Sequence, residues 1–81
     1  MEITNKVTSM LSELCGIEDI RPDQTLQLEL GFDSLQMVTL LVVLEETFDI
    51  VLDESDMNPF SLVLVSDVIT LVEKYLEGKD V

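Results

Sequence analysis

The chain has 81 residues with 17 acidic and 4 basic side chains, and its formal net charge at pH 7 is −13. A chain of this length builds one hydrophobic core, so we expect a single domain over residues 1–81. The negative charge disfavours nucleic acid and anionic membranes as partners, whereas it attracts protein surfaces that carry Lys and Arg patches. A second interpretation, in which the charge only keeps the protein soluble, fits the composition at least as well.

The residue types that most often do chemistry are scarce. The sequence contains no histidine, which excludes Ser-His and Cys-His nucleophile pairs, and we expect no enzymatic activity. Cys15 is the only cysteine, so no internal disulfide can form and a reducing compartment is favoured. No stretch approaches the ~18 apolar residues of a membrane span, and the N-terminus lacks a basic leader pattern, which predicts a cytoplasmic protein.

The first part of the chain predicts a helix followed by a long loop. Apolar residues recur at helical spacing up to about Cys15, where Gly16 is suited to a left-handed cap; they are Ile3, Val7, Met10, Leu11 and Leu14. Residues 17–32 have no helical period. Their alternation near the end would fit a strand, but no second strand pattern exists to pair with it. We therefore expect a loop that is pinned to the core by Ile20, Leu26, Leu30 and Phe32.

A second helix is predicted from about Ser34 to Phe48, because Gly31-Phe32-Asp33-Ser34-Leu35 precedes thirteen residues without Gly or Pro. Asp and Ser are both common helix N-caps, so one interpretation is that Ser34 only caps the helix. In the other interpretation Ser34 carries an anionic group. The unpaired N–H groups and the positive dipole end of the helix would stabilise such a group without any cationic side chain.

The predicted helix has apolar residues on two faces when each residue is turned by about 100°. One face should be buried and consists of Met37, Leu40, Leu41, Leu44 and Phe48. The opposite face carries Leu35, Val38 and Val42. Because an outer helix face has no packing reason to be apolar, we interpret these three residues as a docking surface. The alternative is that the first helix or the loop covers them.

The last third of the chain predicts a short helical turn and a long helix. Residues 54–57 should form the turn, and residues 60–65 are ambiguous between a second turn and a segment that crosses the core. Ser66 and Asp67 are predicted to cap the last helix and Gly78 to end it, with an inward face of Val68, Ile69, Leu71, Val72, Tyr75 and Leu76.

The carboxylates between residues 49 and 56 do not predict a metal site. They lack the glycine and the regular odd-position oxygens of an EF-hand loop, so we interpret them as a solvated acidic surface.

The segment from Leu30 to Ile50 resembles the phosphopantetheine attachment segment of the acyl carrier protein family. The resemblance depends on the string Asp33-Ser34-Leu35 and on residues at fixed distances after it: Val38, Leu40-Leu41, Leu44-Glu45-Glu46 and Phe48-Asp49-Ile50. In that family a transferase esterifies the serine of this string with the 4'-phosphopantetheine of coenzyme A. The resemblance implies that Ser34 is the attachment site, with Asp33 and Leu35 beside it, and that the protein carries acyl or aminoacyl groups as thioesters.

Three longer helices and one short one, with a long loop between the first two, predict an all-α small four-helix bundle, which is the fold of the family. The resemblance implies a phosphopantetheinyl transferase as partner, together with acyl-loading, condensing and acyl-transfer enzymes that carry basic patches. We expect a monomer. The docking surface predicted for these enzymes combines apolar and acidic residues: Leu35, Val38, Val42, Glu45, Glu46 and Asp49.

Two features depart from the fatty-acid carriers of that family. Gln36 and Thr39 stand where those carriers usually have acidic residues, and the segment around Asn58-Pro59-Phe60 is longer. Both features favour a carrier of a specialised pathway, such as polyketide or peptide-like assembly, over one of bulk fatty-acid synthesis. The alternative from another class is an acidic helical adaptor without a prosthetic group, in which Ser34 is only a cap.

Overall fold

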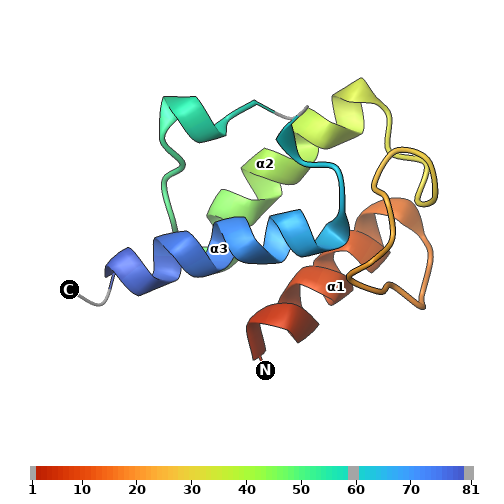
Figure 1. Cartoon of the computed structure of the whole chain (residues 1–81), viewed down its shortest axis with the longest axis horizontal. Helices are drawn as coiled ribbons and strands as arrows, with labels where there is room; N and C mark the ends of the chain where they lie inside the picture. The colour runs from red at the N-terminus through yellow and green to blue at the C-terminus, as the bar shows by residue number, and fades with distance from the viewer. Residues whose placement is uncertain (1, 59–60, 80–81) are drawn as a thin grey trace.

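The computed structural model describes residues 2–58 and 61–79, and these residues form an all-helical fold. Within these ranges the structure has three α-helices, α1 (Glu2–Cys15), α2 (Ser34–Phe48) and α3 (Val65–Lys79), and a 3₁₀ turn, η1 (Glu54–Asp56), between α2 and α3. Figure 1 shows the long loop between α1 and α2 at the end of the molecule where α2 begins. The predicted four-helix bundle is confirmed in part, since the fourth element is a single 3₁₀ turn of three residues.

The core is aliphatic and receives side chains from every helix and from the long loop. On α1 the buried residues are Val7, Met10 and Leu11, and on α3 they are Val65, Val68, Ile69, Leu71 and Val72. The loop adds Leu26, Leu30 and Phe32, which are at most 5% exposed, while Ile20 packs against the core and is half-buried. The prediction that these residues pin the loop is confirmed. No polar side chain is buried in the described part of the chain.

The first helix ends as its sequence predicts. Gly16 has a φ of +77°, and its N–H donates to the carbonyl of Ser12 at 2.8 Å, which closes the last turn of α1. A glycine adopts this left-handed conformation without the steric penalty that a Cβ atom brings. The chain then leaves α1 and enters the loop.

Backbone hydrogen bonds join the loop to the segment that precedes α3. Leu26 N–H donates to the carbonyl of Val63 at 2.9 Å, and Val65 N–H donates to the carbonyl of Gln24 at 3.0 Å. The loop therefore does not form a strand. Within residues 2–58 and 61–79, the only β-type pairing is one isolated antiparallel bridge between Thr25 and Leu64. Two segments far apart in the sequence are held side by side, and this contact positions the start of α3.

Both predicted ends of the last helix need correction. α3 begins at Val65, before Ser66 and Asp67, because loop carbonyls accept its first N–H groups: Ser66 N–H donates to Pro22 at 2.9 Å. Asp67 acts from the third position of the helix, where its Oδ2 accepts the N–H of Leu64 at 2.9 Å. Gly78 does not end the helix, which continues to Lys79.

Of the two structures that the sequence left open for the segment before α3, the described residues show a side chain in the core, that of Leu62. Ser61 N–H donates to the carbonyl of Asn58 at 3.1 Å. Phe60 and Pro59 lie outside the described residues. Among the helices of the described ranges, none has the length and apolar character that a membrane crossing requires.

Candidate functional site

Asp33, and not Ser34, is the N-cap of α2. The Asp33 carboxylate accepts the N–H of Gln36 at 2.8 Å, and the Gln36 side-chain oxygen accepts the N–H of Asp33 at 3.4 Å. This reciprocal pair is a capping box, which satisfies two N–H groups that the helix leaves without partners. The interpretation of Ser34 as a helix cap is therefore wrong: Ser34 is the first residue inside the helix.

The Ser34 hydroxyl is exposed and has no structural task in the described part of the chain. The backbone N–H of Met37 is bonded to the carbonyl of Asp33 at 2.9 Å, so the two N–H groups left at the start of α2 are those of Ser34 and Leu35. The first turn of α2 itself contains no acidic residue, and the Asp33 carboxylate of the capping box is the acidic group that lies at this end of the helix. A phosphate ester on Ser34 fits this environment, since free N–H groups and the helix dipole both stabilise an anion.

A backbone junction at Leu26 holds the start of α2 in place. Leu26 accepts the N–H of Phe32 at 3.0 Å and donates its own N–H to Val63 at 2.9 Å, so the loop, the segment before α3 and the approach to α2 meet at one residue. We call these two hydrogen bonds the Leu26 junction. Gly31 has a φ of +78°, which turns the chain between buried Leu30 and buried Phe32.

A side-chain contact ties the start of α2 to the end of α1. Gln36 Nε2 donates to the carbonyl of Leu14 at 3.4 Å. Gln36 thus has two local partners, one in its own helix terminus and one in α1. A glutamate at this position could also close the capping box, but it could not donate to Leu14.

The two faces of α2 are partitioned as the sequence predicts. The residues predicted to be buried (Met37, Leu40, Leu41, Leu44 and Phe48) are at most 8% exposed. Leu35 is 75% exposed, Val38 49% and Val42 45%. Neither α1 nor the loop covers this outer face, so the alternative that these three residues are core is wrong.

The acidic residues at the end of α2 differ in their surroundings. Glu46 and Asp49 are exposed, and Asp49 ends the helix in the left-handed region with a φ of 54°. Glu45 is half-buried, and its Oε2 accepts the N–H of Leu52 at 2.8 Å. The Glu45 carboxylate thereby fixes the backbone just after α2, so this predicted docking residue also has a structural role.

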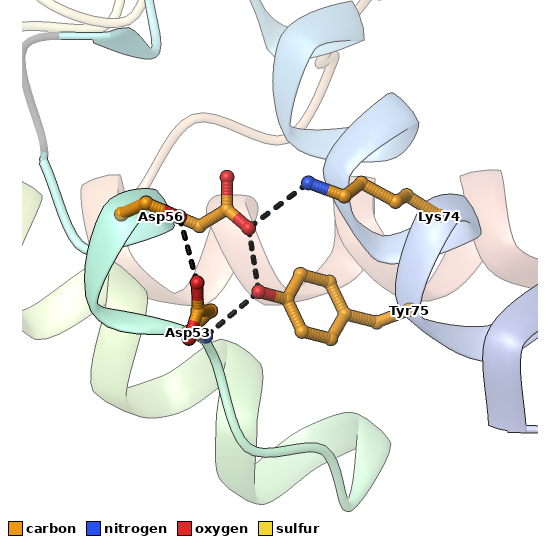
Figure 2. A network of polar contacts seen from close by, with 5 residues as sticks. Asp53, Asp56, Lys74 and Tyr75 are labelled. Carbon is orange, nitrogen blue, oxygen red and sulfur yellow. Dashed lines mark hydrogen bonds and ion pairs between the residues drawn. The ribbon is translucent and has the colours of Figure 1, made fainter.

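A polar cluster that the sequence did not predict connects η1 to α3, and Figure 2 shows its four residues. Tyr75 Oη donates to Asp56 Oδ2 at 2.5 Å and accepts the N–H of Asp53 at 2.7 Å, while Lys74 Nζ lies 3.0 Å from the same Asp56 oxygen. We call this cluster the η1 clasp. No residue of η1 is buried, so polar contacts attach η1 to α3, whereas apolar packing joins the other helices.

The η1 clasp perturbs the ionisation of its members. The hydrogen bond from Tyr75 and then the ion pair with Lys74 lower the pKa of Asp56. The hydrogen bond to Asp56 raises the pKa of Tyr75, and the bond to Asp56 likewise raises the pKa of Lys74. The sequence shows Tyr75 and Lys74 on the last helix, but nothing in it indicates that their partner is Asp56, which lies 19 residues before Tyr75 and 18 before Lys74.

A groove of about 450 Å³ between α1 and α2 lies away from Ser34. It is lined by residues of both helices, among them Met10, Leu14, Val43 and Thr47. Val43 is about 180° around α2 from Ser34 at 100° per residue, so this groove opens on the opposite flank of the helix. The described residues contain no cluster of His, Cys, Asp and Glu that could hold a metal ion.

The fold and the start of α2 define a class of protein: a small helical domain with an exposed serine at the head of its second long helix. Residues 5–72 match the family model described as phosphopantetheine attachment site. The chain is 38% identical over 77 residues to the acyl carrier protein of Desulforapulum autotrophicum, with 91% of this chain and 97% of that protein covered. It is 34% identical over 77 residues to the acyl carrier protein of Thermotoga maritima, with 93% of each chain covered.

The chain belongs to the acyl carrier protein family. Members of this family are carriers rather than enzymes, and their prosthetic group is a covalently attached 4'-phosphopantetheine. The resemblance drawn from residues 30–50 is therefore confirmed at the level of the family.

Proposed function

We propose that this protein carries acyl or aminoacyl groups as thioesters on a 4'-phosphopantetheine arm that is attached to Ser34 Oγ. The observation that supports the proposal is that two neighbouring residues, Asp33 and Ser34, have different roles at the start of α2. Asp33 caps α2 through its bond to Gln36, and the exposed Ser34 hydroxyl is left for chemistry. The arm ends in a thiol, which supplies the thioester chemistry when the group is bound.

The attachment step transfers the arm from coenzyme A. Ser34 Oγ forms a bond to the phosphorus next to the arm, the bond from that phosphorus to the adenosine bisphosphate breaks, and the hydroxyl proton passes to a base of the transferase. The N–H groups of Ser34 and Leu35 and the positive end of α2 then stabilise the phosphodiester. Asp33 and Leu35 complete the immediate surroundings of the site.

The outer face of α2 is our candidate docking surface for the transferase and for the enzymes that load and process the cargo. Its exposed aliphatic residues, Leu35, Val38 and Val42, lie on the same side of the helix as the exposed acidic residues Glu46 and Asp49. Apolar contact combined with negative charge suits a partner surface that is apolar at its centre and basic at its rim. Glu45 contributes to this surface less, since its carboxylate is bonded to Leu52.

A specialised pathway remains our proposal over bulk fatty-acid synthesis, and the supporting departures are Gln36, Thr39 and the longer sequence around residues 58–60. Gln36 is weaker support than Thr39, because its contacts with Asp33 and Leu14 give it a role in the fold. Thr39 donates its hydroxyl to the carbonyl of Leu35 and is otherwise exposed. We further propose that residues 1–81 function as one monomeric domain.

Mass spectrometry tests the proposal directly. Incubation with coenzyme A and a promiscuous phosphopantetheinyl transferase should add ~340 Da to the wild-type protein. Ser34→Ala should take up nothing, and the matched control Ser55→Ala, an exposed serine of η1, should be modified like the wild type. Modification of Ser34→Ala would disprove the site. A wild-type chain that gains no mass, while a reference carrier does in the same tube, would favour the adaptor alternative.

A further inference from the structure

Leu28 is the most exposed of the large apolar residues in the described chain, and a rigid turn holds it outward. It is 90% exposed, although its neighbours Leu26 and Leu30 are 0% and 5% exposed. Glu29 Oε1 accepts the N–H of Thr25 at 3.0 Å, and Thr25 in return accepts the N–H of Glu29 at its hydroxyl at 3.1 Å. Because these reciprocal bonds close the turn, the exposure of Leu28 is a feature of the fold rather than of a loose loop.

Val63 projects from the segment before α3 in a similar way. It is 56% exposed, while the preceding Leu62 is only 6% exposed. Its N–H donates to Asp67 Oδ2 at 3.0 Å, and its carbonyl accepts the N–H of Leu26 at 2.9 Å. Both backbone groups of Val63 are therefore fixed, and its side chain is presented to solvent.

The Leu26 junction brings both residues close to Ser34. Leu28 is two residues from Leu26, Val63 is bonded to Leu26, and Leu26 is bonded to Phe32, two residues before Ser34. Since two residues span about 7 Å at most, Leu28 and Val63 lie within roughly 20 Å of Ser34. An interface of about 800 Å² per partner is roughly 30 Å across, so an enzyme surface that covers Ser34 and is centred toward the Leu26 junction would reach both.

We infer that Leu28 and Val63, together with Leu35, form an apolar surface around Ser34 that docks onto the phosphopantetheinyl transferase; this inference rests on the proposed function. The transferase must bring its reacting atoms to Ser34 Oγ, so its surface has to cover the surroundings of that residue. The surface comes from three segments: the long loop, the connection before α3 and the first turn of α2.

The charges around this surface specify the chemistry of the partner. Glu29 and Asp33 are exposed beside the apolar residues, and Arg21, the single cation of the long loop, is paired with Asp23 at 3.5 Å. A complementary transferase surface is therefore apolar opposite Leu28 and Val63 and carries Lys or Arg residues at its rim.

Serine substitutions test the inference without changing the net charge. The variants are Leu28→Ser, Val63→Ser and the double variant, and the matched control is Val51→Ser, because Val51 is 84% exposed beyond the other end of α2. We measure kcat/KM for the transferase by mass spectrometry and the Tm by circular dichroism. The double variant should lose about 10-fold in kcat/KM through a higher KM, as expected for about 1.4 kcal/mol of lost contact. The control should stay within twofold of the wild type.

Charge insertion provides a second test that does not depend on how well the serine variants fold. Leu28→Lys places a cation against the apolar part of the transferase surface and near its basic rim, so it should slow modification more than Leu28→Ser does, whereas Val51→Lys should not. Wild-type kinetics in the double variant, or an equal loss in the Val51→Ser control, would overturn the inference. A wild-type protein that takes up no mass would instead overturn the proposed function, and the two failures are thus distinguishable.

Discussion

The Leu26 junction and the η1 clasp stabilise two parts of the molecule by opposite means. Around Ser34 the chain is positioned by backbone hydrogen bonds of Leu26, with Asp33 as cap of α2. At η1, where no residue is buried, the chain is held by the side chains of Asp56 and Tyr75. When a site is positioned by backbone hydrogen bonds, its side chains remain available for binding or reaction. This explains how Ser34 is placed firmly while its hydroxyl remains unused.

The Leu26 junction and the η1 clasp also differ in their response to pH. The Leu26 junction contains only backbone groups, which do not titrate. The η1 clasp depends on an ionised Asp56 and a protonated Tyr75, and the pKa of each is shifted by the other. We therefore expect variants to separate function at the start of α2 from stability at η1.

The largest expected effect concerns α2, the helix that leads from one region to the other. Leu44 is 0% exposed and Val42 is 45% exposed. Leu44→Asp should leave the protein largely unfolded, because an unpaired carboxylate in the core costs several kcal/mol, comparable to the stability of a small domain. Val42→Asp should melt nearly like the wild type and yet be modified more slowly. Circular dichroism melts and transferase rates decide this, and early melting of Val42→Asp would show that the outer face supports the fold.

An intermediate effect is expected from the two aspartates that precede helical elements. Asp33→Ala removes the capping box of α2 and should cost about 1 kcal/mol, or roughly 4–8 °C in Tm. Asp53 precedes η1 without a side-chain capping bond, so Asp53→Ala is the matched control and should lower the Tm less. Equal losses in the two variants would mean that the capping box adds nothing to stability.

The smallest effect is expected from Tyr75→Phe, which removes the hydroxyl at the centre of the η1 clasp. The Tm should fall by at most about 5 °C, since a single hydrogen bond between half-buried side chains contributes little, and the rate of modification at Ser34 should not change. A slower transferase reaction at unchanged Tm would contradict the separation of the two regions.

The pH dependence of this variant follows from the direction of each pKa shift. Asp56 has a pKa below its ordinary value of 3.8, so its contribution is complete above that value and is lost as the pH falls through the lowered pKa. Tyr75 has a pKa above its ordinary value of 10.0, so its contribution is complete below that value and is lost as the pH rises through the raised pKa. The Tm difference between wild type and Tyr75→Phe should be constant from about pH 5 to 9 and shrink on both sides.

Much of the fold follows from local patterns. The helical spacing from Ile3 to Leu14 and the position of Gly16 predict α1, and the uninterrupted run after Asp33 predicts the bounds of α2 and both of its faces. These features depend on residues within a few turns of one another, so a sequence read in order is enough to find them.

The errors occur where distant residues decide the outcome. The sequence pattern predicts the wrong start for α3, because the first N–H groups of this helix bond to the carbonyls of Pro22 and Gln24, more than 40 residues earlier in the chain. The pattern of apolar residues indicated the inward position of Tyr75, but its bond to Asp56 depends on how the chain before α3 folds back. Such partners are brought together by packing, which no local spacing encodes.

The sequence alone determined the helical class, the two faces of α2, and the family to which residues 30–50 point, because each depends on short-range periodicity or on a contiguous motif. It could not determine which of Asp33 and Ser34 caps α2, since both residue types have the same preference for that position. Only the tertiary structure decided this. The capping box between Asp33 and Gln36, tied by Gln36 to the end of α1, takes the role of cap and leaves the Ser34 hydroxyl exposed.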